Sequence, residues 1–346
     1  MATPDVTIMG AGIFGLSIAF ACARRGAAVR VVERRGVGAG SSGGVVGALA
    51  PHTPENWNPK KQFQFESLTM AQSFFAEVDA LSGRSSGYAR LGRVQAVENA
   101  RGLELAQARI AGARAHWAEA YQWQVLQSCG DWGPQSPTGH WVHDTLSGRI
   151  HPMMACQSLA AAVAALGSQI AQGDEAPDGT PVIWATGAEG LDALSHEIGK
   201  QVGNGVKGQA LTLGFERPDA PQIFADGVHI VPHQNGTVAI GSTSERAFDD
   251  PVATDAQLDA LHAKALAKCP VLRDAPVVQR WAGVRPRARS RAPMLGNWPG
   301  RPGHFVANGG FKIGFGMAPK VAEVMADLVL EGRDAIPNGF RVEDSL

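Results

Sequence analysis

The chain has 346 residues, of which 45% are hydrophobic and 18% are charged, and its 31 basic and 32 acidic residues leave a net charge of −1. This length exceeds what one hydrophobic core usually serves, so we expect two domains. Because the charge is balanced, a general attraction to nucleic acid or to an anionic membrane surface is excluded.

The first predicted elements are a strand, a glycine-rich turn, a helix and a second strand. An apolar run at 6–9 precedes Gly10, Gly12 and Gly15, and the second strand ends at Glu33. In a dinucleotide-binding fingerprint, the first glycine permits the tight turn, the second lets the backbone approach a pyrophosphate, and the third lets the helix pack close to the strand. The pyrophosphate is expected at the free N–H groups that begin the helix.

Glu33 narrows the choice of dinucleotide. It follows Gly15 by 18 residues, where a carboxylate accepts hydrogen bonds from the adenosine ribose and repels a 2′-phosphate. NADP is therefore disfavoured, and FAD and NAD remain open. A glycine-rich turn in another kind of α/β unit is the alternative, but the apolar strands on both sides argue against it.

The next segments alternate between regular elements and glycine-rich loops. Residues 36–44 read GVGAGSSGG, a composition that brings backbone close to a flat or charged partner. The apolar spacing predicts helices over 60–81 and 101–117 and a strand over 90–97. Residues 129–148 are rich in Gly, Pro, Ser and Thr and are expected to form a loop or short strands.

The second half of the chain is predicted to be mostly antiparallel β structure. An Asn-Gly pair at 235–236 between alternating apolar runs is a strong hairpin signal. The elements expected here are helices over 152–166, 255–268 and 318–330 and strands over 181–184, 208–215, 228–232, 237–241 and 277–281.

Four further segments indicate a family. They are 41–44 (SSGG), 182–187 (VIWATG), 281–287 (WAGVRPR) running on to 293–296 (PMLG), and 308–314 (NGGFKIG) before Ala318-Pro319. In this order and at these separations the chain resembles the FAD-dependent amine oxidoreductases related to D-amino acid oxidase, particularly glycine oxidase and sarcosine oxidase. The resemblance extends from Val6 to Arg341.

The resemblance implies an α/β fold in which a Rossmann-like FAD-binding domain is interleaved with an antiparallel-β-rich substrate domain. The FAD-binding domain would comprise residues 1–84, 148–204 and 283–346, and the substrate-binding domain residues 85–147 and 205–282. The last helix would begin at the flavin ring, where its dipole stabilises the negative charge of the reduced cofactor. The residues expected to contact FAD are Gly10, Gly12, Ile13, Phe14, Gly15, Glu33, Arg34, Ser41, Ser42, Gly43, Gly44, Val45, Thr186, Gly187, Arg285, Gly309, Gly310, Phe311, Lys312 and Ile313.

Arg285 and Lys312 are the expected substrate-binding residues. The family holds the substrate carboxylate with an arginine at the position of Arg285, and a guanidinium matches a carboxylate in bidentate geometry. Lys312 reproduces a Gly-Phe-Lys of sarcosine oxidases, where glycine oxidases tend to have arginine. The alternatives are a solvated basic stretch over 285–291 and a surface lysine, although a cation at a helix start opposes the helix dipole.

Three departures from the family pattern matter. His229 stands where glycine oxidase has a tyrosine, which argues against glycine as the substrate. No cysteine occurs at 292–294, where sarcosine oxidase tethers its cofactor, so FAD is expected to bind non-covalently. The short 167–180 connection is expected to lack the strands that usually lie on the adenine side.

His52 and His229 are further candidates for lining the substrate pocket, as positioning groups rather than as bases.

The resemblance implies oxidation of a small amino acid or N-substituted amino acid. A hydride would pass from the α-carbon to flavin N5, water would hydrolyse the resulting imine, and oxygen would reoxidise the flavin. Two alternatives stay open: a flavin dehydrogenase that passes electrons to a quinone or a carrier protein, and a non-catalytic FAD-binding module. An NAD-dependent dehydrogenase is the third rival, and the glycine-rich segment at 308–314 argues against it.

Cysteine and histidine usage bounds the remaining possibilities. The four cysteines are far apart and show no metal-ligand spacing, as expected for reduced thiols in a cytoplasmic protein. His140, His143 and His151 come nearest to a cluster but lack a neighbouring acid or cysteine, so no metal is expected. No apolar run approaches 18 residues, and no secretory signal is evident. The sequence does not indicate an oligomeric state.

Overall fold

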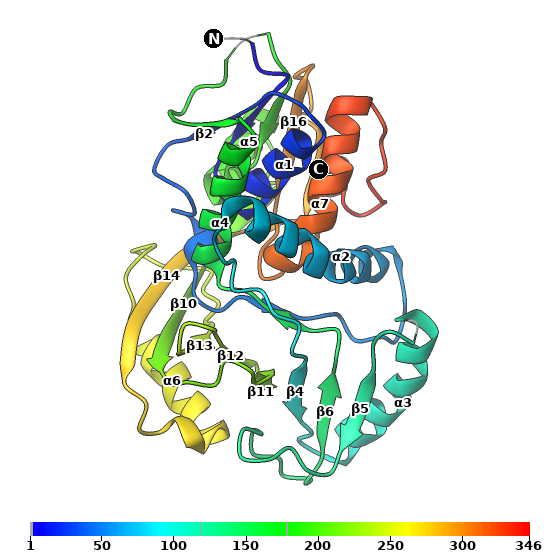
Figure 1. Cartoon of the computed structure of the whole chain (residues 1–346), viewed down its shortest axis with the longest axis vertical. Helices are drawn as coiled ribbons and strands as arrows, with labels where there is room; N and C mark the ends of the chain where they lie inside the picture. Colours follow the sequence, from blue (N-terminus) through cyan, green and yellow to red (C-terminus); the bar gives the residue numbers. More distant parts are fainter. Residues whose placement is uncertain (1–2, 118, 178) are drawn as a thin grey trace.

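The computed structural model describes residues 3–117, 119–177 and 179–346, and it contains two large sheets (Figure 1). The first sheet has the strand order β15-β16-β9-β1-β2-β8, and every neighbouring pair is parallel except β15 with β16. Its strands are β1 (Val6–Met9), β2 (Val29–Glu33), β8 (Gln169–Gln172), β9 (Val182–Trp184), β15 (Met294–Asn297) and β16 (His304–Asn308).

Helices pack against this sheet, because neighbouring parallel strands must be joined by a crossover connection, which is usually an α-helix. Helix α1 is apolar on nearly all sides and is buried from Ile13 to Ala23, because it packs against both α4 and α7. Helix α2 covers α4 and α7 from outside (Figure 1). The helices of this half are α1 (Ile13–Arg24), α2 (Pro59–Ser82), α4 (Pro152–Ala165), α5 (Gly187–Ile198) and α7 (Gly314–Glu331).

The second sheet has eight strands in the order β14-β10-β13-β12-β11-β4-β6-β5. Most neighbours are antiparallel, and the Asn-Gly turn joins β12 to β13 as the sequence predicts. Helix α6 (Ala256–Lys268) packs on β10, β12 and β13, and α3 (Ala100–His116) packs on β5. The strands are β4 (Arg93–Ala96), β5 (Trp123–Leu126), β6 (Trp141–Asp144), β10 (Gly203–Gly214), β11 (Gln222–Ala225), β12 (Val228–Pro232), β13 (Thr237–Gly241) and β14 (Val277–Ala288).

Two short strands and three 3-10 turns are the remaining regular elements of the described residues. Strands β3 (Ala48–Leu49) and β7 (Gly148–Arg149) pair antiparallel. The 3-10 turns are η1 (Ser41–Gly43), η2 (Pro270–Leu272) and η3 (Val342–Ser345).

The structure corrects three predictions. The 167–180 connection is not devoid of strands, because β8 forms there and pairs with β2 at the edge of the sheet. Strand β14 continues seven residues beyond the expected end at Trp281, which places Arg285 within a strand. Helix α7 begins at Gly314, not at Ala318, so Pro319 lies inside the helix, where it has no N–H to donate to the Phe315 carbonyl oxygen.

The two sheets draw on different stretches of the chain. The first takes strands from 6–33, 169–184 and 294–308, and the second from 93–144 and 203–288. The domain boundaries expected from the sequence stay a prediction. Among the described residues, no helix is both long enough and apolar enough to cross a bilayer.

Candidate functional site

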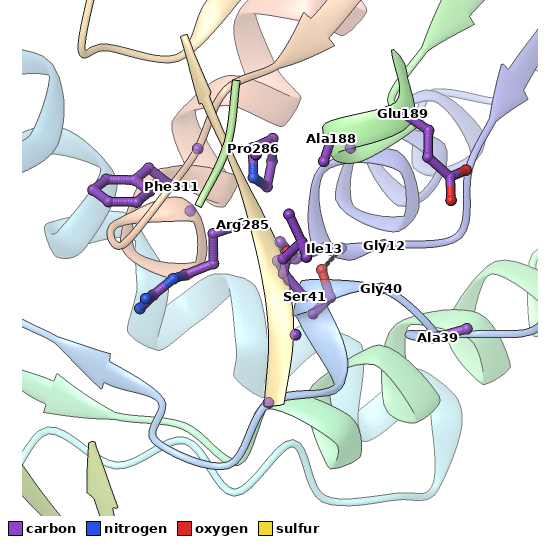
Figure 2. A pocket seen from close by; sticks show the side chains of 18 of the residues that line it. Gly12, Ile13, Ala39, Gly40, Ser41, Ala188, Glu189, Arg285, Pro286 and Phe311 are labelled. Atoms are coloured by element: carbon purple, nitrogen blue, oxygen red, sulfur yellow. Dashed lines mark hydrogen bonds between the residues drawn. The ribbon is translucent and has the colours of Figure 1, made fainter. Parts of the chain in front are cut away.

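A cavity of about 1380 Å³ is lined by elements of both sheets. This volume exceeds the roughly 300–1,000 Å³ of ordinary small-molecule sites, so the cavity has room for a large ligand together with a small one. Its walls include the start of α1, the end of β2, the segment 39–48, the start of α5, strand β14 and the start of α7 (Figure 2).

The N-terminal glycines shape one wall of this cavity. Gly10 has a φ of +107°, and a Cβ there would lie 2.5 Å from the Ala185 carbonyl oxygen. A Cβ on Gly15 would lie 1.9 Å from the Gly10 carbonyl oxygen, so this glycine lets α1 fold close to the turn. Gly12 lines the cavity itself, beside the Ser42 hydroxyl, which accepts a hydrogen bond of 3.0 Å from the Ile13 N–H. The turn thus presents bare backbone to the cavity.

Glu33 lies at the end of β2 and lines the same cavity. Its carboxylate accepts hydrogen bonds from the N–H groups of Ala11 and Arg35, both at 2.8 Å. Next to it, the exposed Arg34 and Arg35 both form ion pairs with Glu189 in the first turn of α5. These pairs join the two sides of the cavity rim at the end where Glu33 lies.

Three helices begin at the cavity wall. Gly12 and Ile13 at α1, Gly187 at α5 and Gly314 at α7 all line it. The N-cap residue of each helix makes no side-chain capping hydrogen bond. The first N–H groups of a helix lack intrahelical partners and carry partial positive charge, so the cavity favours an anionic or electron-rich ligand.

Arg285 is buried in β14, with 8% of its surface exposed. Its Nη1 donates to the Ser242 hydroxyl at 2.7 Å, and its Nη2 donates to the carbonyl oxygens of Thr243 at 2.6 Å and Lys207 at 3.3 Å. The buried Nε has no acceptor among the described residues. Burial lowers the pKa of the guanidinium to about 10, which leaves Arg285 charged near neutral pH. It is therefore a cation with donor capacity to spare.

Phe311 and Lys312 lie on the loop before α7, and both are close to Arg285 of β14. The Arg285 guanidinium carbon lies 5.5 Å from the centre of the Phe311 ring, and the Lys312 ammonium nitrogen lies 5.8 Å from it. Burial and the positive charge of Arg285 lower the pKa of Lys312. Neither cation forms an ion pair with an acidic side chain of the described residues. Phe311 has a φ of +45°, a strained conformation for a bulky residue and one that clusters at functional sites.

The two candidate histidines have different positions. His229 on β12 lines the cavity, and burial, assisted by the charges of Arg93 and Lys312, lowers its pKa to about 3. It is therefore neutral near pH 7. His52 is exposed, does not line the cavity, and is held by Gln64 of α2. The expectation that His52 lines the substrate pocket is therefore not met, because the chain after β3 leaves this side chain at the surface.

Most of the predicted site residues line the cavity, and four cofactor candidates lie behind its wall. A Cβ on Gly43 would lie 2.5 Å from the Gly38 carbonyl oxygen, and one on Gly309 would lie 2.7 Å from the Ala288 Cβ. These glycines therefore permit close chain contacts, as Gly15 does, and Ile313 serves as the N-cap residue of α7. The candidates that line the cavity are Gly10, Gly12, Ile13, Phe14, Glu33, Arg34, Ser41, Ser42, Gly44, Val45, Thr186, Gly187, His229, Arg285, Gly310, Phe311 and Lys312.

Sequence reasoning missed several lining residues. Asn308 donates to the Gly187 carbonyl oxygen and accepts from the Gly309 N–H, both at 2.8 Å, and so ties the start of α5 to the loop before α7. In the sequence, the position of Asn308 directly before Gly309 and Gly310 could have indicated that it belongs to the site. Phe224 on β11 and Trp281 on β14 come from the second sheet, and Ser242 and residues 246–249 and 251–252 from the connection between β13 and α6. Trp281 begins the 281–287 segment, but no local motif identifies the others.

The described residues contain no cluster of His, Cys, Asp or Glu able to hold a metal ion. None of the four cysteines lines the cavity, and Cys22, Cys156 and Cys269 are buried thiols whose pKa burial raises to about 12.

The chain is similar to known proteins over most of its length. A family model described as FAD-dependent oxidoreductase matches residues 5–328. The chain is 25% identical over 357 residues to the bifunctional protein ThiO/ThiG of a Nostoc species, covering 95% of this chain and 53% of that protein. It thus spans about half the length of that relative. It is also 25% identical to a glycine oxidase of Geobacillus kaustophilus, covering 94% of this chain and 92% of the relative.

Solved structures share the fold. The structure of a Geobacillus kaustophilus glycine oxidase has a TM-score of 0.85 at 23% identity and covers 98% of both chains. An iminodiacetate oxidase from a Chelativorans species has a TM-score of 0.81 at 20% identity, over 97% of this chain and 98% of that one. At these identities the likeness concerns the fold.

Proposed function

The chain belongs to the family of FAD-dependent oxidoreductases, and from that premise we propose that it oxidises the C–N bond of a small amino acid or N-substituted amino acid. The observation that carries the proposal is the pair of cations, Arg285 and Lys312, which line the cavity and form no ion pair with an acidic side chain of the described residues. Glu245, whose negative charge acts on Arg285, pairs with Lys207. A substrate carboxylate is a ligand that matches such a pair in charge and hydrogen bonding.

The residues present fit FAD. Gly12, Glu33 and Ser42 would hold the ADP half, in a stretch where a helix start favours phosphate and a carboxylate suits ribose hydroxyls. The segment 44–48 and the loop before α7 would enclose the flavin ring. When bound, FAD supplies the group that accepts a hydride from substrate.

The remaining work falls to the protein's own side chains. Arg285 and Lys312 would fix the substrate carboxylate and thereby orient the α-carbon, so that positioning supplies much of the rate. His229 is neutral near pH 7, so it adds no further positive charge beside Arg285 and Lys312. Phe224 and Trp281 add apolar surface to the cavity wall, which limits the access of water.

Anaerobic reduction tests the reaction. FAD-loaded protein would be mixed with glycine, sarcosine, proline and a series of D-amino acids, and the flavin absorbance near 450 nm would be followed. We expect bleaching by at least one of these compounds. If none bleaches the flavin, the protein is a cofactor-binding module without this chemistry.

Reoxidation tests the electron acceptor. We propose that oxygen accepts the electrons of the reduced flavin. The bleached protein should therefore regain its absorbance within seconds after mixing with air-saturated buffer. Reduced protein that persists for minutes in oxygen, but is reoxidised by a quinone analogue, would instead identify a dehydrogenase.

A further inference from the structure

The side chain of Arg285 crosses a neighbouring strand before it reaches its hydrogen-bond acceptors. In the register of β14 with β10, Arg285 pairs with Val206, and Gly283 pairs with Gly208. The Nη1 and Nη2 atoms bond to Ser242 and Thr243, which lie beyond β10 on the segment that follows β13. The guanidinium therefore lies over β10 itself.

Gly208 provides the space for this crossing. A Cβ at this position would lie 2.0 Å from Nη2 and 2.4 Å from the Cζ atom of Arg285. Both atoms belong to the far end of the Arg285 side chain, and the third close atom is the Nε of the same residue. Gly208 is not among the glycines with a positive φ. An alanine at 208 is therefore compatible with the strand and incompatible only with the guanidinium in its present place.

A buried polar network on the opposite face of β10 holds the acceptor segment. Glu245 and Lys207 exchange backbone hydrogen bonds of 2.9 and 3.0 Å, and their side chains approach to 3.7 Å. Gln209 donates to Glu245 at 3.0 Å, and the Gln209 N–H donates to the Thr243 hydroxyl at 2.8 Å. Lys207, Gln209 and Glu245 have 3%, 0% and 7% of their surfaces exposed. Because side chains alternate along a strand, this network lies behind Gly208 and leaves its front face to Arg285.

We propose that Gly208 and Ser242 are positioning residues for Arg285: together they fix its guanidinium against β10, aimed at the substrate carboxylate. The inference rests on the proposed function of Arg285. A guanidinium whose place is set by backbone and by a buried hydroxyl keeps its orientation without substrate, so little ordering remains to be done on binding.

The first test is Gly208→Ala in FAD-loaded protein. The added methyl group should displace the guanidinium by about 1 Å or more and raise KM on the order of 10-fold to 100-fold, with kcat nearly unchanged. Gly214→Ala is the matched control on the same strand, because a Cβ there meets Pro276 and Val278 at an ordinary 3.4 Å. It should leave KM within about twofold of the wild type. Ser242→Ala, which removes the acceptor of Nη1, should raise KM in the same direction as Gly208→Ala.

A double-mutant cycle separates positioning from general damage to the sheet. In an Arg285→Ala background the methyl group of Gly208→Ala has no guanidinium to displace, so it should change KM by less than about twofold. A second readout that needs no turnover is the flavin absorbance of the loaded variants titrated with acetate. The affinity for acetate should follow the same pattern as KM.

The outcomes are distinguishable. If Arg285→Ala weakens acetate and substrate but Gly208→Ala does not, the positioning role is refuted and the proposed function stands. An equal effect of Gly208→Ala in both backgrounds would also refute it, since strand distortion would then explain the loss. If Arg285→Ala itself changes neither acetate affinity nor KM, Arg285 does not bind a carboxylate, and the role of Gly208 fails with the proposed one.

Discussion

Replacing Arg285 with alanine should weaken substrate binding without releasing the cofactor. Three hydrogen bonds to Ser242, Thr243 and Lys207 occupy much of the guanidinium, and no described residue accepts a hydrogen bond from the buried Nε. Truncating one partner of a buried charged pair costs about 2 to 5 kcal/mol. Because Lys312 would still attract the carboxylate, we expect the lower end, about 2 to 3 kcal/mol. This corresponds to a KM raised about 30-fold to 200-fold.

Steady-state kinetics at saturating FAD measure the change in KM, and flavin fluorescence measures retention of the cofactor. The control is Arg287→Ala on the same strand. Arg287 also lies near the Phe311 ring, at 5.6 Å, but it does not line the cavity. We expect the control to leave KM within about threefold of the wild type. Loss of FAD from the Arg285 variant, or an unchanged KM, would show that the role assigned to Arg285 is wrong.

Three further outcomes are expected. Glu33→Ala removes the acceptor of the Ala11 and Arg35 N–H groups as well as the ribose contact, so fluorescence titration should show FAD binding weakened at least about tenfold, with KM unchanged at saturating FAD. Lys312 has a lowered pKa and loses its charge as pH rises, so KM of the wild type should increase at alkaline pH, and Lys312→Met should flatten that rise if the lysine holds the carboxylate. Burial lowers the pKa of His233 from 6.5 to about 3, so the unfolded chain binds a proton that the folded protein does not. Stability should therefore fall as pH drops through that window, by about 2 kcal/mol from this residue between pH 7 and pH 5. Urea unfolding of His233→Gln should show a correspondingly smaller loss, and an identical loss would contradict the assignment.

Short-range patterns in the sequence predicted the residues that form one wall of the cavity. The turn at Gly10 and the acid at Glu33 lie within one βαβ unit, and the serines at 41–42 follow it closely. Hydrophobic periodicity with glycine spacing specifies such a unit locally. The sequence also indicated Arg285 and Lys312, and the structure brings both to Phe311 although 27 positions separate them. Glycines were harder to interpret, because a glycine that touches a ligand and one that touches the chain look alike in sequence. Gly43 and Gly309 lie close to other parts of the chain and do not line the cavity.

The family, the parallel sheet with its dinucleotide turn and the importance of the two cations could all be predicted from the sequence. Which other residues line the cavity with these cations depends on how distant strands pair. Ser242, Phe224 and Trp281 reach the cavity because β10 to β14 pair across long separations, and no short-range pattern specifies that register. The same pairing sets Gly208 beneath Arg285, while the direction of the chain after β3 leaves His52 at the surface. The local sequence specifies where a turn or a charged residue occurs along the chain, whereas strand pairing between distant segments determines which residues that charge contacts.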